Sequence, residues 1–198
     1  VIDINDPLSP FIATSTHTGP GIASISRKDD FLFVANTGVS QVQVISIEKP
    51  NEPKLIIEIK LPGVIVSGGM GIGRSTFVVN SDLYIGLTKA NGPELFLLDI
   101  SNPFLPNIES SVEINSLVSD ISAGYKYLAI SNATEESLIL LDRSNLDKVD
   151  GYTFPNWNIQ SGQKVFVLGH DIYLGRNTTG VGVKYSELIK VETLNSTT

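Results

Sequence analysis

Three aspartates, Asp3, Asp99 and Asp142, recur at one position of a repeated phrase, and Ser46 takes that position in another copy. Carboxylates at equivalent places could bind a metal ion or take part in acid–base chemistry. A metal ligand would not readily be replaced by serine, whereas a serine hydroxyl keeps a hydrogen bond and loses only the charge. Aspartate after a buried strand can accept backbone N–H bonds and stabilise the turn. We therefore expect these four positions to be structural.

The glycine-rich segment 68–73 resembles a phosphate-binding loop. It lacks the Lys-Ser/Thr pair of such loops and follows no strand-to-helix transition, so we do not expect nucleotide binding. Permissive glycines are typical of a flexible insertion. Met70 and Arg74 are still candidates for contacts with a partner.

Metal and nucleophile chemistry have little support in this sequence. His17 and His170 are the only histidines; they fall in different predicted turns, and no HExxH or EF-hand spacing occurs. No G-x-S-x-G motif is present, and the adjacent Glu135 and Glu136 are typical of a solvated loop. The chain has no cysteine, which excludes thiolate ligands and thiol catalysis. We expect no metal, no cofactor and no catalytic residue.

Composition excludes two classes of partner. Of the 198 residues 41% are hydrophobic, which is enough for a core, and the net charge is −7. The 14 lysines and arginines are scattered, so no basic stripe is present to bind the phosphates of a nucleic acid. No apolar stretch approaches the roughly 20 residues that span a bilayer. We expect no nucleic-acid partner and no membrane insertion by this segment.

The elements that position these residues follow from a repeat. An apolar triplet, a polar residue and a proline-bounded turn recur as VIDINDPLSP at 1–10, VISIEKPNEP at 44–53, LLDISNPFLP at 97–106 and, in worn form, LLDRSNLDKV at 140–149. The usual interval is close to the roughly 40–45 residues of a propeller blade. Tight hairpins precede the phrase and mixed polar strands follow it, while helical periodicity is nearly absent. This pattern predicts an all-β propeller of four-stranded antiparallel blades.

The blades are expected to form a single repeat domain. A half blade at 1–17 precedes blades at 22–60, 64–114, 117–154 and 163–194. In the last blade, 181–185 is a faded candidate for the third strand and 188–193 for the fourth. The half blade lacks its first two strands, so either the missing pair lies upstream or the array is an open arc.

An up-and-down meander separates the connections into two rims. One rim carries the hairpin turns and the proline-bounded turns, and the other carries the second-to-third loops and the blade-to-blade loops. Because function tends to lie on variable loops held by a rigid scaffold, we expect binding on the second rim. The candidates are His17, Met70, Arg74, Lys89, Asn91, Asn132, Glu135, Asn156, Trp157, Asn158 and Arg176.

Trp157 is the only tryptophan in the chain. An exposed tryptophan would be an anchor for a sugar or protein partner. The alternative is that Trp157 fills the gap between two blades, and the sequence does not decide between the two.

Segments such as ELFLLDISNPFLP and VIDINDPLSP, with strands such as YKYLAISN, resemble the LVIVD repeat family. Ser46 and Lys49-Pro50 depart from the family pattern in the second copy, and Leu146 replaces the proline in the fourth. The resemblance implies β-propeller-like repeats of bacterial extracellular or cell-surface proteins. It implies no common enzymatic activity.

The sequence therefore favours a non-enzymatic binding module that presents its loop-rich rim to a protein or carbohydrate partner. One alternative is a propeller-type glycoside hydrolase or lyase, which would need acidic or histidine side chains converging across blades. The other is a structural spacer in a surface filament, whose rim would have no concave polar pocket.

Overall fold

The computed structural model describes residues 1–19, 21–38, 40–62, 72–134, 136–154, 160–178 and 186–192. Within these ranges the secondary structure consists of β-strands. In chain order they are β1 (Ile2–Asp3), β2 (Phe11–Ile12), β3 (Ile22–Lys28), β4 (Phe31–Asn36), β5 (Val42–Ser46), β6 (Lys54–Ile59), β7 (Gly73–Val79), β8 (Asp82–Leu87), β9 (Leu95–Asp99), β10 (Asn107–Val112), β11 (Val118–Ala123), β12 (Tyr127–Asn132), β13 (Glu136–Asp142), β14 (Lys148–Thr153), β15 (Gln160–Leu168), β16 (Asp171–Thr178) and β17 (Ser186–Glu192). The described residues include no helix of the length and apolarity that crossing a membrane requires.

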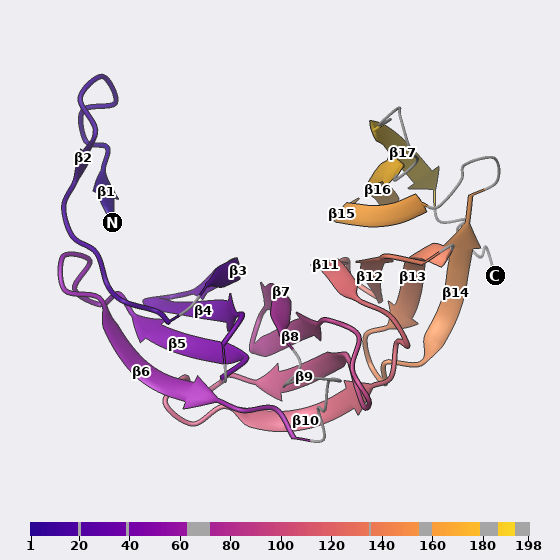
Figure 1. Ribbon diagram of the computed structural model, residues 1–198, viewed down its shortest axis with the longest axis horizontal. Helices are drawn as coiled ribbons and strands as arrows, with labels where there is room; N and C mark the ends of the chain where they lie inside the picture. The colour runs from indigo at the N-terminus through magenta and orange to yellow at the C-terminus, as the bar shows by residue number, and fades with distance from the viewer. Residues whose placement is uncertain are drawn as a thin grey trace.

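The strands form four successive antiparallel meanders, which we call blades 1 to 4: β3–β6, β7–β10, β11–β14 and β15–β17. The blades follow one another around an arc, with β3, β7, β11 and β15 on its inner side (Figure 1). β6, β10 and β14 lie on the outer side (Figure 1). The predicted fold class, an all-β propeller of antiparallel blades, is confirmed.

Apolar side chains between neighbouring sheets hold the blades together. Phe33 and Val44 of blade 1 pack with Phe96 and Leu98 of blade 2 in the first of three such clusters. The other two lie between blades 2 and 3 and between blades 3 and 4. The third strands β5, β9 and β13 are buried at most positions, as a strand covered on both faces requires. Each fully buried large side chain contributes about 1.5–3 kcal/mol.

Residues in the left-handed region close three of the hairpins between first and second strands. Asp29 has φ 49°, Asn80 has φ 55° and Gly169 has φ 62°. Glycine, asparagine and aspartate are the residue types that adopt this conformation most readily. These turns fix the register in which the second strand of each blade returns along the first.

Blade 4 differs from the sequence-based expectation. β17 pairs directly with β16, from Asn177↔Ser186 to Asp171↔Glu192. It therefore takes the third position in the sheet, and the expected assignment of 188–193 to a fourth strand is wrong. The continuous antiparallel register leaves no room for another strand between them. The candidate third strand at 181–185 lies outside the described residues.

The leading strands form a small sheet of their own. β1 and β2 pair antiparallel through Ile2↔Ile12 and Asp3↔Phe11, and no other described strand joins them. This hairpin stands apart from blade 1, near the open side of the arc (Figure 1).

Candidate functional site

The loop rim is the end of the blades that carries the second-to-third loops and the blade-to-blade loops, and the turn rim is the opposite end. Connection length does not separate them as clearly as expected, because turns 47–53 and 100–106 are as long as loop 88–94. What distinguishes the loop rim is the way in which buried polar side chains hold its loops.

One buried polar residue stands at the start of the third strand in each of blades 1 to 3. Gln41, Glu94 and Ser137 are all 0% exposed, and each bonds to a loop backbone. The sequence analysis missed these residues. They could have been found from their constant offset before the repeat positions Ser46, Asp99 and Asp142.

Glu94 makes the most extensive of these anchors. Its Oε1 accepts the N–H of Ala90 at 3.0 Å, and its Oε2 accepts those of Ile114 and Asn115, both at 2.9 Å. Ala90 belongs to the loop within blade 2, whereas Ile114 and Asn115 lead into blade 3. One carboxylate therefore fixes both loops, and charge-assisted hydrogen bonds are the strong ones.

Four of the expected binding residues, His17, Arg74, Lys89 and Asn91, are exposed. Lys89 also has a structural contact, because its Nζ donates to the carbonyl of Asn115 at 2.7 Å. This bond joins the same two loops that Glu94 holds from inside, so Asn91 lies in a loop that is fixed on both sides.

Asn132 and Arg176 are buried, so their expected place on the binding surface is wrong. Asn132 is 0% exposed, and its Oδ1 accepts the N–H of Thr134 at 2.9 Å in a turn. Arg176 is 3% exposed, pairs with Glu187 at 2.5 Å and lies over the Phe154 ring. Burial lowers the pKa of Arg176, and Glu187 opposes that shift. Asn132 is the last residue of β12 and Arg176 lies near the end of β16, both second strands, and sequence periodicity did not reveal their burial.

The remaining candidates lie outside the described residues. They are Met70, Glu135, Asn156, Trp157 and Asn158.

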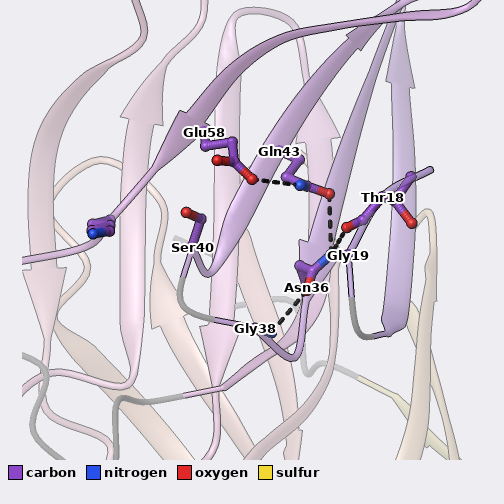
Figure 2. A pocket seen from close by; sticks show the side chains of 8 residues that line it. Thr18, Gly19, Asn36, Gly38, Ser40, Gln43 and Glu58 are labelled. Atoms are coloured by element: carbon purple, nitrogen blue, oxygen red, sulfur yellow. Dashed lines mark hydrogen bonds between the residues drawn. The ribbon is translucent and has the colours of Figure 1, made fainter. Parts of the chain in front are cut away.

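A cavity of about 350 Å³ is present on the loop rim of blade 1 (Figure 2). It is lined by the linker before β3, the loop between β4 and β5 and the end of β6, through Thr18, Gly19, Asn36, Gly38, Ser40, Gln43, Glu58 and Lys60. We call this the blade-1 cavity. None of its lining residues was among the sequence-based candidates.

A chain of side-chain amides crosses the floor of the blade-1 cavity (Figure 2). Gly38 donates its N–H to Asn36 Oδ1 at 2.8 Å, which leaves Asn36 Nδ2 as a donor to Gln43 Oε1 at 3.0 Å. Asn36 Nδ2 also donates to the carbonyl of Thr18. Gln43 Nε2 then donates to Glu58 Oε1 at 2.7 Å. Because each amide has one orientation that satisfies its neighbours, the network holds the Glu58 carboxylate in place.

One of these polar side chains, Gln43, replaces apolar ones at equivalent positions of the neighbouring blades. By strand register, Gln43 corresponds to Phe96 and Ile139. Asn36 corresponds to Leu87 in blade 2 and to Asn132 in blade 3, where an asparagine recurs. Phe96, Ile139 and Leu87 are buried core residues, whereas Gln43 and Asn36 are 4% and 2% exposed. Burying amides is unfavourable unless they are hydrogen-bonded. Blade 1 is thus built differently from its neighbours at this point.

The repeat positions lie on the turn rim, and each accepts a hydrogen bond from the residue two places on. Asp99 Oδ1 accepts the Ser101 N–H at 2.7 Å, and Asp142 Oδ1 accepts that of Ser144 at 2.8 Å. The other pairs are Asp3 with Asn5 at 2.9 Å and Ser46 with Glu48 at 3.4 Å. This is the turn-stabilising contact expected of scaffold residues.

Hydrogen bonding lowers the pKa of Asp99, first through the Ser101 backbone and then through its hydroxyl. A lowered folded-state pKa means that the carboxylate stabilises the turn above its unfolded pKa, and that this contribution is lost as the pH falls through the folded value. We predict that Ser101→Ala raises the pKa of Asp99 partway towards its ordinary value, as measured by carboxyl ¹³C NMR titration. Asp142 in the same spectrum is the control and should not move. An unchanged pKa for Asp99 would contradict the assignment.

Across the described ranges, no three His, Cys, Asp or Glu side chains come together as a metal site would require.

No family model and no curated protein sequence matches the chain. Solved structures do. The β-propeller domain of Cps50 (Swd1) from Myceliophteria thermophila is 13% identical with a TM-score of 0.66, over 93% of this chain and 60% of that one.

Two further structures are similar at lower TM-scores. A nidogen/laminin complex chain is 9% identical with a TM-score of 0.52, over 83% of this chain and 60% of that one. A hypothetical selenium-binding protein from Sulfolobus tokodaii is 17% identical with a TM-score of 0.52, over 82% and 45%. The chain thus spans 60% or less of the length of these structures. At such identities the likeness shows the fold alone: the chain is built as blades of a β-propeller.

Proposed function

We propose that this chain is a non-enzymatic binding module that holds a protein or glycan partner on its loop rim. The observation that carries this is the construction of the rim, where Gln41, Glu94 and Ser137 fix the loops from inside while Asn91 and Lys89 remain exposed. Loops held in one conformation lose little entropy on binding, which favours affinity.

The proposal extends to the LVIVD repeat family and to a place on the bacterial cell surface or outside the cell. The support is the resemblance of the repeat phrases and a fold whose similar structures include a chain of a nidogen/laminin complex. A chain without cysteine that is stabilised by packing between sheets fits such a place.

The glycosidase alternative is less well supported by the blade-1 cavity. Glycoside hydrolysis commonly uses two carboxyl groups on either side of the scissile bond. Among the residues that line the cavity, Glu58 is the only carboxylate. The spacer alternative is disfavoured because the described part of the loop rim does contain a concave polar pocket.

The test is site-specific photocrosslinking. A benzoylphenylalanine replaces Asn91 on the loop rim or, as the matched control, the exposed Asn51 on the turn rim, and the protein is irradiated in a cell-envelope extract. We expect adducts from position 91 at a yield about fivefold or more above position 51, because a bound partner covers only one rim. Protease and periodate treatment of the adducts then separate protein from glycan partners. Equal yields from the two rims, or a higher yield from position 51, would refute the proposal.

A further inference from the structure

We propose that the blade-1 cavity binds one sugar ring of a neutral glycan, with the Glu58 carboxylate accepting hydrogen bonds from neighbouring hydroxyl groups. This inference rests on the proposed binding function of the loop rim and names a ligand class for one part of it. Four properties of the cavity support it: the hydrogen-bonding capacity that its network leaves over, its charges, its place in the blade and its size.

The amide network leaves the cavity with a fixed acceptor. Glu58 Oε1 receives the Gln43 amide at 2.7 Å, whereas no described donor bonds to Oε2. Gln43 in turn is held by Asn36, and Asn36 by the N–H of Gly38. Glu58 is exposed, and the hydrogen bond from Gln43 restricts its carboxylate before a ligand arrives, which lowers the ordering cost of binding. Two hydroxyl groups on adjacent ring carbons present two O–H donors that one carboxylate can accept together.

The charges of the cavity favour a neutral ligand. Glu58 and Lys60 are two residues apart on β6 and its continuation, and neither forms an ion pair with a described residue. An anionic ligand would meet Glu58 and a protein of net charge −7, and a cationic ligand would meet Lys60. A neutral hydroxyl group can donate to the carboxylate and accept from the ammonium, so a polyhydroxylated ring satisfies both without burying a charge of its own.

Gln43 also occupies a position where blades 2 and 3 have core residues. Phe96 and Ile139 fill the equivalent place in blades 2 and 3, and both pack into apolar clusters. Replacing such a residue by Gln43 removes apolar packing and requires a hydrogen-bonding network in its place. The network ends at the Glu58 carboxylate, which lines the cavity. This arrangement is better suited to binding a polar ligand than to packing against another sheet.

The cavity volume of about 350 Å³ lies at the lower end of the range for small-ligand sites. A cavity of this volume accommodates a single sugar ring together with some water. Ser40 and Lys60 line the cavity and are further hydrogen-bonding groups for the ring hydroxyls. The cavity is on the loop rim, so the rest of a longer glycan could extend from it along the surface.

The experiment is a ¹H–¹⁵N NMR titration of the whole chain with glucose, galactose, mannose and N-acetylglucosamine, each added separately up to about 100 mM. The signals to follow are the backbone amides of Gly19 and Gly38 and the side-chain amides of Asn36 and Gln43. We expect saturable shifts at these signals for at least one sugar, with a Kd of about 1–10 mM, as is reasonable for a single small neutral ring.

Two variants and one further ligand sharpen the test. Glu58→Gln should weaken binding about tenfold, because a neutral amide replaces the charged acceptor. Glu109→Gln makes the same change on β10, the outer strand of blade 2, and should leave the Kd unchanged. Glucuronate, an anionic ring, should bind at least about threefold more weakly than glucose, if glucose is the sugar that binds.

The proposal is overturned if none of the four sugars shifts these amides saturably, or if Glu58→Gln binds as well as the unchanged protein. Its failure is separable from failure of the proposed function. Photocrosslinking from position 91 without sugar binding would refute the cavity assignment alone. Sugar binding with equal crosslinking from both rims would refute the wider role of the rim and leave the cavity as a small-ligand site.

Discussion

Replacing Glu94 by alanine is expected to lower the free energy of unfolding by about 3–5 kcal/mol, measured by urea denaturation. The carboxylate is 0% exposed and accepts three backbone N–H groups, from Ala90, Ile114 and Asn115. Removing it leaves the buried Ala90 donor and the part-buried Ile114 and Asn115 donors without their acceptor, and opens a cavity beside the loops that join blades 2 and 3. The loss of order should be visible as faster amide exchange in segments 88–94 and 113–117.

Two controls separate the role of the carboxylate from the effect of any substitution. Glu94→Gln keeps one acceptor oxygen but directs an NH₂ group at N–H donors, so its loss should be smaller, about 2–3 kcal/mol. Glu109→Ala removes an exposed glutamate from β10 and should change stability by less than about 0.5 kcal/mol. A loss below about 1 kcal/mol for Glu94→Ala would show that the loops are held by other contacts.

Gly73→Ala is expected to destabilise the protein by about 2–3 kcal/mol, because the new methyl group has no room between blades 1 and 2. A Cβ at Gly73 would lie 2.4 Å from the Gln41 carbonyl oxygen and 3.0 Å from both the backbone N and O of Asn36. These are backbone atoms, so the contact can be relieved only by moving the strands apart. The separation would also widen the contact between the inner strands β3 and β7, where Ser26 donates to the Thr76 carbonyl at 2.8 Å.

The matched control for Gly73 is Gly175→Ala in β16. The nearest atoms to a Cβ there are Lys164 Cβ and O, both at 3.7 Å, which is ordinary contact distance. Alanine should therefore be neutral or slightly stabilising at position 175, since it also restricts the unfolded chain. Equal midpoints of denaturation for the two variants would show that the blades accommodate the methyl group at position 73.

The fold could be predicted from the sequence because the residue pattern that produces it is local and repeated. Phrases such as LLDISNPFLP combine an apolar strand, a residue that accepts turn hydrogen bonds and a turn, and each copy must be covered on both faces by its neighbours. Asp99 and Asp142 make the turn contacts that this reading assigned to them. Blade 4 was harder to predict, because its repeat is worn and its described third strand, β17, mixes polar and apolar residues as an edge strand does.

The candidate site was much harder to predict from the sequence. Asn132 and Arg176 lie at or near the ends of strands in loop-like sequence and were expected on the surface, but both side chains are buried. Gln43 gave no signal as a polar residue within an apolar strand, and Glu94 could be found only through its constant offset before the repeat position Asp99. The roles of Glu94 and Gln43 depend on hydrogen-bond donors from other segments of the chain. Ile114 donates its N–H to Glu94, and Asn36, which is itself oriented by the N–H of Gly38, donates to Gln43.

Periodicity alone therefore determined the blade as the repeating unit, the strand order of blades 1 to 3 and the structural role of the repeat positions, because these follow from contacts between residues close in the chain. Only the tertiary structure decided which polar side chains are buried as loop anchors and where a cavity forms. The cavity arises where the linker before β3, the end of β4 and the end of β6 meet in space, and the hydrogen bonds that define it join segments far apart in the chain.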